Sequence, residues 1–317
     1  MTTQTTAQAP GIHRTLGEAA ASLLSNTTKS APQWSAITPR WLVSLLPWQP
    51  VEAGVYRVNR VADGPEVIAD GVECSPDDTS AALPESFVDY APSPREYRLN
   101  AVTAVLEVQT RVTDIHNVPH DQVREQLRLT IEKVKESQDD QLINNADYGL
   151  LTQVAPNFRI PTRAGAPTPD DLDELLALVW KQPSFFLAHP RAIAAFGREC
   201  TRRGVPPVVT SLFGAQFITW RGVPIIPTDK LAVTGGKDAT TNILLVRTGL
   251  EKQGVVGLFQ PGVPGEVQPS LSVRFMGIDL SAVASYLVTL YCSVAVHTQD
   301  ALAALHGVEV DHYHDYD

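Results

Sequence analysis

The most regular hydrophobic pattern in the chain is a stripe of apolar residues with helical spacing in its first half. Its members recur every three or four residues and are Val123, Leu127, Ile131 and Val134. Charged side chains fill the positions between them. The pattern predicts an amphipathic helix that begins at Pro119, where proline suits a first turn, and continues to about Leu142. Because only one face is apolar, we expect the helix to lie across a sheet.

Two shorter helices are predicted later in the chain. The first begins at Thr168, since Thr168, Pro169 and Asp171 supply an N-cap, a first-turn proline and an acidic third position. Four apolar residues follow at helical spacing, namely Leu172, Leu175, Leu176 and Val179. The second helix extends from about residue 190 to residue 200 and is ended by Gly204.

Runs rich in β-branched and aromatic residues predict the strands. They are residues 55–60, 97–112, 216–220, 225–226, 242–247, 255–259 and 271–276, and a long strand near the end of the chain. This last segment, residues 280–296, is nearly uncharged and almost long enough to span a membrane as a helix. Its apolar residues alternate, however, which favours a buried strand. The whole pattern predicts a mixed α+β architecture with a helix-backed sheet and no internal repeat.

Residues 61–96 differ sharply from the rest in composition. The segment has nine acidic residues against one basic residue, and five prolines. Such a segment cannot form a core of its own, so we expect an outward loop between the strands at 55–60 and 97–112. A two-stranded arm of this length needs a partner surface to lie on.

Composition limits the possible functions. The formal net charge of -10 disfavours nucleic acid or an anionic membrane as the main partner. The three cysteines, Cys74, Cys200 and Cys292, are far apart and suit a reducing cytosol. The first residues lack the basic and apolar regions of a signal peptide. Residues 1–39 form either a disordered tail or an arm that orders against a neighbouring subunit, with one short apolar patch at residues 19–24.

A search for catalytic or metal-binding motifs finds weak candidates only. Walker A, G-x-G-x-x-G, H-E-x-x-H and G-x-S-x-G patterns are missing from the sequence. The terminal run at residues 311–317 could chelate a metal but reads more simply as a solvated tail. The acidic group at residues 170–174 is explained by a helix first turn, His116 and His120 by surface or capping roles, and residues 235–237 by a hairpin turn. We therefore predict no catalytic residue, no cofactor and no metal site.

A series of short runs, taken in order, carries a resemblance to a known family. They are SAITPRWL at 35–42, PVEAGVYRVNR at 50–60, SPREY at 93–97, PHDQ at 119–122, LRLTIE at 127–132, GAPTPDDL at 165–172, FITWRG at 217–222, LFQPG at 258–262, SVRFMG at 272–277 and HDY at 314–316. The chain resembles the family 2A encapsulins, which include mycobacterial major membrane protein I and the cyanobacterial SrpI-type shell proteins. The resemblance covers about residues 20–317.

This resemblance implies an α+β fold like that of the HK97 phage major capsid protein. The expected parts are an N-terminal arm (1–39), the start of a P-domain (40–60), an E-loop (61–112), a P-domain with the spine helix (113–165), an A-domain (166–270), and P-domain return strands with the C-terminal tail (271–317). By position, residues Arg202, Arg203, Gly204, Val205, Pro206 and Pro207 would approach a fivefold pore, where two arginines would favour anions. The alternative is that the two arginines cap the end of the preceding helix.

The resemblance also implies a function. The chain is expected to be a non-enzymatic shell subunit, of which about 60 copies form an icosahedral T=1 compartment in the cytoplasm. The expected cargo is a cysteine desulfurase, bound to the luminal face through its disordered N-terminal extension, with a role in sulfur metabolism or storage. Neither nucleic acid nor membrane insertion is expected, although particles of this size would pellet with membranes. The alternatives are a bacteriophage-type capsid protein and a small metal-dependent enzyme that uses the terminal His/Asp run.

Overall fold

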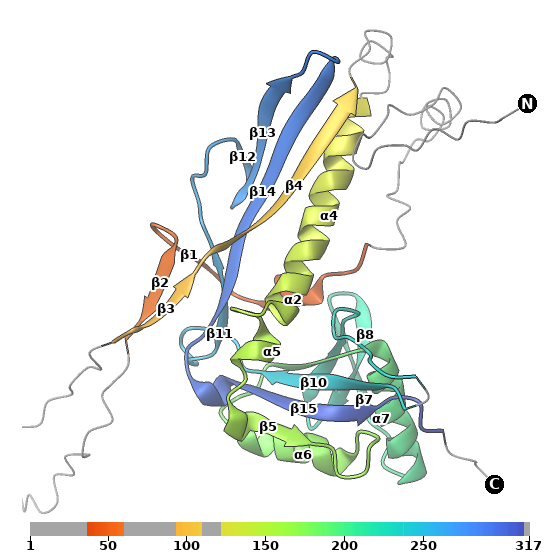
Figure 1. Ribbon diagram of the computed structural model, residues 1–317. Helices are drawn as coiled ribbons and strands as arrows, with labels where there is room; N and C mark the ends of the chain where they lie inside the picture. The colour runs from red at the N-terminus through yellow and green to blue at the C-terminus, as the bar shows by residue number, and fades with distance from the viewer. Residues whose placement is uncertain (1–36, 60–92, 110–121, 237, 314–317) are drawn as a thin grey trace, which may run out of the picture.

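Two β-sheets and one long helix form the framework of the protein (Figure 1). The computed structural model describes residues 37–59, 93–109, 122–236 and 238–313. A six-stranded sheet extends away from a seven-stranded sheet, and helix α4 (Gln122–Asn144) runs along the first and reaches the second. The mixed α+β architecture predicted from the sequence is confirmed.

Helix α4 confirms the prediction from the apolar stripe. Leu127, Ile131 and Val134 pack on Leu271, Val288 and other apolar residues of the six-stranded sheet. Beyond this stripe, Leu142 and Ile143 near the end of α4 are fully buried in the core that it shares with the seven-stranded sheet. The predicted start at Pro119 lies outside the described residues. The helix therefore fixes the two sheets relative to one another.

The six-stranded sheet is built around one long strand, β14 (Val283–Val296). This strand pairs antiparallel with β13 (Leu271–Ile278), β4 (Asn100–Gln109) and β11 (Val255–Phe259). The remaining strands are β1 (Trp48–Pro50), parallel to β11, and β12 (Glu266–Gln268), antiparallel to β13. The alternating segment at residues 280–296 is thus a strand, as predicted.

The seven-stranded sheet has the order β5-β15-β10-β6-β9-β8-β7. Its strands are β5 (Arg159–Pro161), β6 (Phe185–Ala188), β7 (Val208–Leu212), β8 (Ala215–Trp220), β9 (Val223–Pro227), β10 (Thr240–Val246) and β15 (Leu302–Glu309). On one face, Phe186 and Ala188 pack with helices α6 (Pro169–Leu178) and α7 (Pro190–Arg202). On the other face, Phe185 and Leu187 join the core that includes the end of α4. The sheet is therefore buried on both faces.

Short helices complete the core between the two sheets. Helix α2 (Trp41–Leu45) buries Leu42 and is followed by the buried Leu46, and helix α5 (Leu150–Gln153) buries Leu150. Two 3-10 turns, η1 (Pro156–Phe158) and η2 (Gln299–Ala301), precede β5 and β15. The dense apolar run after residue 40 thus covers one face of the seven-stranded sheet.

Helix α6 begins as predicted from its capping residues. The Thr168 hydroxyl accepts from the Asp171 backbone N–H, and the Asp171 carboxylate accepts from the Thr168 backbone N–H. Leu172 and Leu175 are fully buried below this cap. Helix α7 also lies where the sequence predicts it, with Pro190 in its first turn.

The predicted strand at 97–112 is divided into two strands with different partners. Strand β3 (Arg95–Arg98) pairs with β2 (Val55–Val58), whereas β4 pairs with β14 in the large sheet. The break falls at Leu99, which packs on a small core that includes Tyr97 and Val256. Leu99 is thus partly buried at the point where the arm ends, and β4 lies outside the arm. The acidic segment at 61–92 lies outside the described residues.

The chain passes between the two sheets within two of the expected domains. Strands β11 and β12 fall within residues 166–270 but belong to the six-stranded sheet. Strand β15 falls within residues 271–317 but pairs with β10 and β5 in the seven-stranded sheet. The reason is that β14 carries the chain back from the first sheet into the second, where β15 fills the gap between β5 and β10.

Candidate assembly surfaces

The tip of the hairpin formed by β13 and β14 carries a group of exposed apolar side chains. They lie at the end of the six-stranded sheet that is farthest from the seven-stranded sheet (Figure 1) and are Phe275, Met276, Ile278 and Leu280. The first three are 57–61% exposed, and Leu280 is fully exposed. We call these four residues the hairpin-tip patch. In water such a patch is unfavourable unless another surface covers it.

The turn of this hairpin is well ordered by local hydrogen bonds. The Asp279 carboxylate accepts from the backbone N–H groups of Ser281 and Val283, at 2.8 and 2.9 Å. Phe275 is oriented by the ring of Tyr286 across the strand pair, with centroids 5.4 Å apart. The apolar side chains are thus held outward by a fixed backbone, which suits docking because little entropy is lost on binding.

A second exposed apolar surface lies on the β7–β8 hairpin at the edge of the seven-stranded sheet. Val208, Val209 and Phe213 are each more than half exposed. Phe213 has a φ of 52°, a left-handed conformation that is strained for a bulky residue. Its ring lies 6.1 Å from that of Trp41, so the hairpin tip also contacts helix α2.

The six residues predicted for a pore connect helix α7 to this edge strand. Arg202 ends the helix and Arg203 is its C-cap, as the alternative interpretation expected. Both guanidinium groups reach the carboxylate of Glu199, at 2.8 and 3.5 Å, and Arg203 also lies 3.4 Å from Asp170. Gly204, Val205 and Pro206 are exposed. The arginines therefore balance a buried acid at the helix end, while their outer faces remain open to solvent.

The acidic group at the start of α6 is used for structure rather than proton transfer. Asp171 forms the cap, Asp173 pairs with Arg221, and Glu174 pairs with Arg163. Hydrogen bonds from Arg221 and Trp220 outweigh burial and lower the pKa of Asp173. Asp170 and Asp171 lie in the first turn of α6, as predicted, whereas Asp173 and Glu174 lie beyond it.

An acid-rich junction joins helix α4 to the segment at residues 38–43 and to the loop after β9. The carboxylate of Glu136 accepts from the Thr38 backbone N–H and hydroxyl, both at 2.9 Å. It also pairs with Arg40 at 3.3 Å and with Lys230 at 3.0 Å. This one carboxylate thus ties together three segments that are far apart in the sequence.

Asp139 lies at the centre of this junction and is only 2% exposed. One carboxylate oxygen, Oδ1, has no hydrogen-bond partner within the part of the chain that the structure describes. A cavity of about 170 Å³ adjoins it, with Thr38, Trp41, Pro227 and Asp229 among the lining residues. Burial raises the pKa of Asp139 to about 6, with Lys230 opposing the shift and Glu136 adding to it. No sequence pattern indicates this group, because Asp139 occurs there as one more charged position on an amphipathic helix.

The other candidates for chemistry are not brought together. Asp311 pairs with Arg191, and the rest of the terminal run includes residues 314–317, which lie outside the described residues, as do His116, His120 and Cys74. Cys200 and Cys292 are buried, and burial raises the pKa of each thiol. Thr234 and Thr240 pair across residues 235–239, so a hairpin turn is confirmed there.

The described residues offer neither a metal site nor a membrane-spanning helix. No group of three or more His, Cys, Asp or Glu side chains is placed to hold a metal ion in that part of the chain. No helix in the described ranges is long and apolar enough to cross a membrane.

Comparison with known proteins assigns the chain to one family. Residues 70–312 match the family model of SrpI-like type 2A encapsulin shell proteins. The chain is 62% identical over 301 residues to the type 2A encapsulin shell protein SrpI of Synechococcus elongatus, covering 95% of this chain and 96% of the relative. It is 61% identical, with the same coverage, to a type 2A encapsulin shell protein of Mycobacterium leprae.

Solved structures agree with the sequence comparison. The cryo-EM structure of the holo-SrpI encapsulin complex from Synechococcus elongatus superimposes with a TM-score of 0.81 at 59% identity, over 95% of this chain and 99% of that chain. A structure from Microbacterium phage Oxtober96 has a TM-score of 0.61 at 11% identity, over 90% of this chain and 97% of that chain. The second likeness shows the fold alone, which is that of HK97-like capsid proteins, and confirms the predicted fold class.

Proposed function

The chain belongs to the type 2A encapsulin shell proteins, and from that membership we propose that about 60 copies assemble into an icosahedral T=1 cage that encloses a cysteine desulfurase. Members of this family are structural shell proteins rather than enzymes, and they form capsid-like assemblies. The main support for the proposal is the identity of 62% over nearly the whole of both chains. Subunit surfaces that form a closed shell must fit one another, so they are expected to be retained in a relative of this similarity. The rival interpretations, a phage-type capsid protein and a metal-dependent enzyme, have no comparable support.

The exposed apolar surfaces support assembly through obligate contacts. The hairpin-tip patch and the β7–β8 hairpin lie in different parts of the molecule, as different copies of a closed shell would require. Interfaces of this kind bury on the order of 2,000 Å² or more. In this proposal the six-stranded sheet with α4 is the core of the P-domain, and the seven-stranded sheet with α6 and α7 is the core of the A-domain.

The proposed cargo is a cysteine desulfurase held on the luminal wall through its disordered N-terminal extension. A disordered segment binds weakly for its area, but many identical wall sites raise the effective concentration of binding sites. The implied role is sulfur handling in the cytoplasm: cysteine enters through pores, the cargo removes the sulfur, and the compartment stores it. This assignment rests on the family resemblance.

Co-expression with a cysteine desulfurase that has such an extension tests the cargo. We expect the enzyme to co-sediment with the particles and to lose this association when its extension is deleted. A matched desulfurase without an extension is the control and should remain outside. Equal amounts of both enzymes in the particle fraction would contradict the proposal.

The pore proposal concerns Arg202 and Arg203, whose exposed faces would line a fivefold opening together with residues 204–207. Because both arginines also pair with Glu199, their replacement could loosen the helix end, so thermal stability must be measured alongside entry. Double replacement by alanine should slow the entry of a small anionic fluorophore into intact particles and leave a neutral fluorophore unaffected. Unchanged entry of the anion would remove the pore role.

A further inference from the structure

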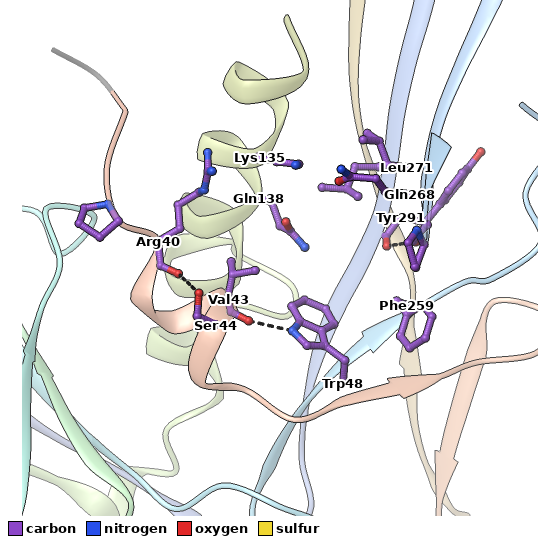
Figure 2. Close-up of a pocket in the computed structure, with 14 residues that line it drawn as sticks. Arg40, Val43, Ser44, Trp48, Lys135, Gln138, Phe259, Gln268, Leu271 and Tyr291 are labelled. Carbon is purple, nitrogen blue, oxygen red and sulfur yellow. Dashed lines mark hydrogen bonds between the residues drawn. The ribbon is translucent and has the colours of Figure 1, made fainter. Parts of the chain in front are cut away.

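A groove of about 530 Å³ lies between helix α2, helix α4 and the six-stranded sheet. Figure 2 shows side chains of all three converging on it. Arg40 and Gln268 lie on opposite sides of the groove (Figure 2), and their chain neighbours Pro39 and Pro269 also line it. The groove has no role in the proposed shell contacts, cargo capture or pore.

The floor of the groove is apolar and firmly held. It is formed by Trp48, Phe259, Leu271 and Leu290, of which the last two are almost completely buried. The indole N–H of Trp48 donates to the Val43 carbonyl at 2.9 Å, which fixes the ring (Figure 2). The floor therefore suits aliphatic side chains, and it would need little rearrangement to receive them.

Two polar groups of helix α4 face the groove without partners. Gln138 is only 8% exposed, and its amide makes no hydrogen bond with any described residue. Lys135, one turn earlier on the same face, forms no ion pair within the described ranges. The Gln138 amide is open to the groove, so a ligand that places a main-chain group there would satisfy its hydrogen bonds. Together the two groups call for peptide main chain beside Gln138 and a carboxylate beside Lys135.

We propose that this groove binds an N-terminal segment of a copy of this chain, centred on residues 16–24. The described chain enters the structure at Ile37 and lines the groove two residues later, at Pro39. When extended, the stretch from Leu24 to Ile37 spans up to about 43 Å, which is ample to reach back into the groove or into that of a neighbour. Continuity of the chain therefore delivers this segment to the site.

The composition of the segment matches the groove. Residues 1–51 contain a single acidic side chain, Glu18, which would pair with Lys135. Leu23 and Leu24 form an apolar pair a few residues after Glu18 and would cover the Trp48 floor. Each unpartnered feature of the groove thus has one counterpart in the segment.

Disulfide trapping in the full-length protein tests occupancy. Ser22→Cys, which keeps both leucines, is combined with Gln268→Cys at the rim, in a Cys74→Ser background. A disulfide requires Cα atoms within about 7 Å, so mild oxidation should cross-link at least about half of the chains. Lys252→Cys, an exposed position outside the groove, replaces Gln268→Cys in the control pair. Both an intramolecular and an intermolecular cross-link support the inference, whereas a yield no higher than the control overturns it.

A charge exchange tests the pairing of Glu18 with Lys135. Lys135→Glu should lower the cross-linked fraction at least about fivefold, and adding Glu18→Lys should restore it. Lys133→Glu, exposed on the same helix but outside the groove, should leave the yield unchanged. Loss without restoration by the exchange would overturn the pairing.

The inference does not depend on the cargo, and the two accounts can fail separately. Particle size is measured on the same samples by sedimentation. Full-sized particles without the cross-link would overturn the groove assignment and leave the proposed shell intact. A cross-link formed only in small oligomers would support the groove and contradict the proposed shell.

Discussion

Asp139 lies among several charged groups where helix α4 meets residues 38–43 and the loop after β9. It is surrounded by Glu136 on its own helix, by Asp229 and Lys230 on the loop after β9, and by the Val43 backbone N–H, which donates to it. Burial lowers the pKa of His189 at the start of α7, and the charge of Asp229 opposes this shift. Burial is the main cause of the raised pKa of Asp139, and Glu136 and Asp229 add to the shift while Lys230 and the Val43 N–H oppose it.

Replacement of Asp139 by asparagine therefore predicts a specific change in the pH profile of stability. The folded-state pKa of about 6 lies above the unfolded value of 3.8, so the wild type loses stability as pH rises from 4 to 6. The variant lacks this loss and should be more stable at pH 7 by about 3 kcal/mol, with little difference at pH 4. Denaturant unfolding at both pH values measures this, and parallel profiles would contradict the assignment.

Gly257 is a second residue whose identity is dictated by one contact. A Cβ atom at this position would lie 2.7 Å from the indole ring of Trp48, which paves the groove. Gly257→Ala should therefore displace the ring and lower the free energy of unfolding by about 1–3 kcal/mol. Gly197→Ala, where a Cβ atom meets nothing within 4 Å, is the control and should not destabilise helix α7. Equal stability of both variants would show that the Trp48 ring can move aside without lowering the free energy of unfolding.

At the scale of elements, the hairpin of β13 and β14 is the clearest candidate for a contact between copies. Its turn is ordered by Asp279, yet it holds Leu280 completely in solvent. Hydrogen bonds that hold an apolar side chain in solvent indicate that the tip is covered in the assembled state.

Leu280→Asp should leave the fold of the chain intact, because surface substitutions usually change stability by less than about 0.5 kcal/mol. It should reduce the yield of assembled particles at least about tenfold, since the interface would have to bury a charge. Leu280→Ala keeps the position apolar and should still assemble. Circular dichroism and sedimentation separate the two effects, and normal assembly of the aspartate variant would place the tip outside every interface.

The elements also show which features of the fold were readable from the sequence. Helices α4, α6 and α7 were predictable because their stripes and caps are local signals. Strands β6 and β15 were not predicted, since both faces of the sheet are buried there and Phe185–Ala188 has no alternation to read. The division of β3 from β4 was missed because the break at Leu99 is set by tertiary packing.

The candidate sites were less predictable than the fold. The hairpin-tip patch is made of ordinary strand residues whose exposure is decided by where the sheet ends. Likewise, Gln138 and Asp139 are adjacent polar residues in the sequence, and only the packing of α2 makes one a groove residue and the other a buried acid. The pore residues were selected through the resemblance, and the structure adds their pairing with Glu199.

At the scale of the whole molecule, the structure suits a subunit of a closed shell. Its two sheets and the connecting α4 give a rigid body with apolar surfaces in different parts of the molecule, while the described residues contain no metal cluster. As a member of the type 2A encapsulin shell proteins, the chain acts as a structural subunit that forms part of a wall.

The particle mass of the purified chain tests this account most directly. Sedimentation or mass photometry at micromolar protein and neutral pH should give a single species of about 2 MDa, sixty times the 34.4 kDa chain, with few free subunits. A persistent monomer or dimer under the same conditions would contradict the assignment of this chain to a closed shell.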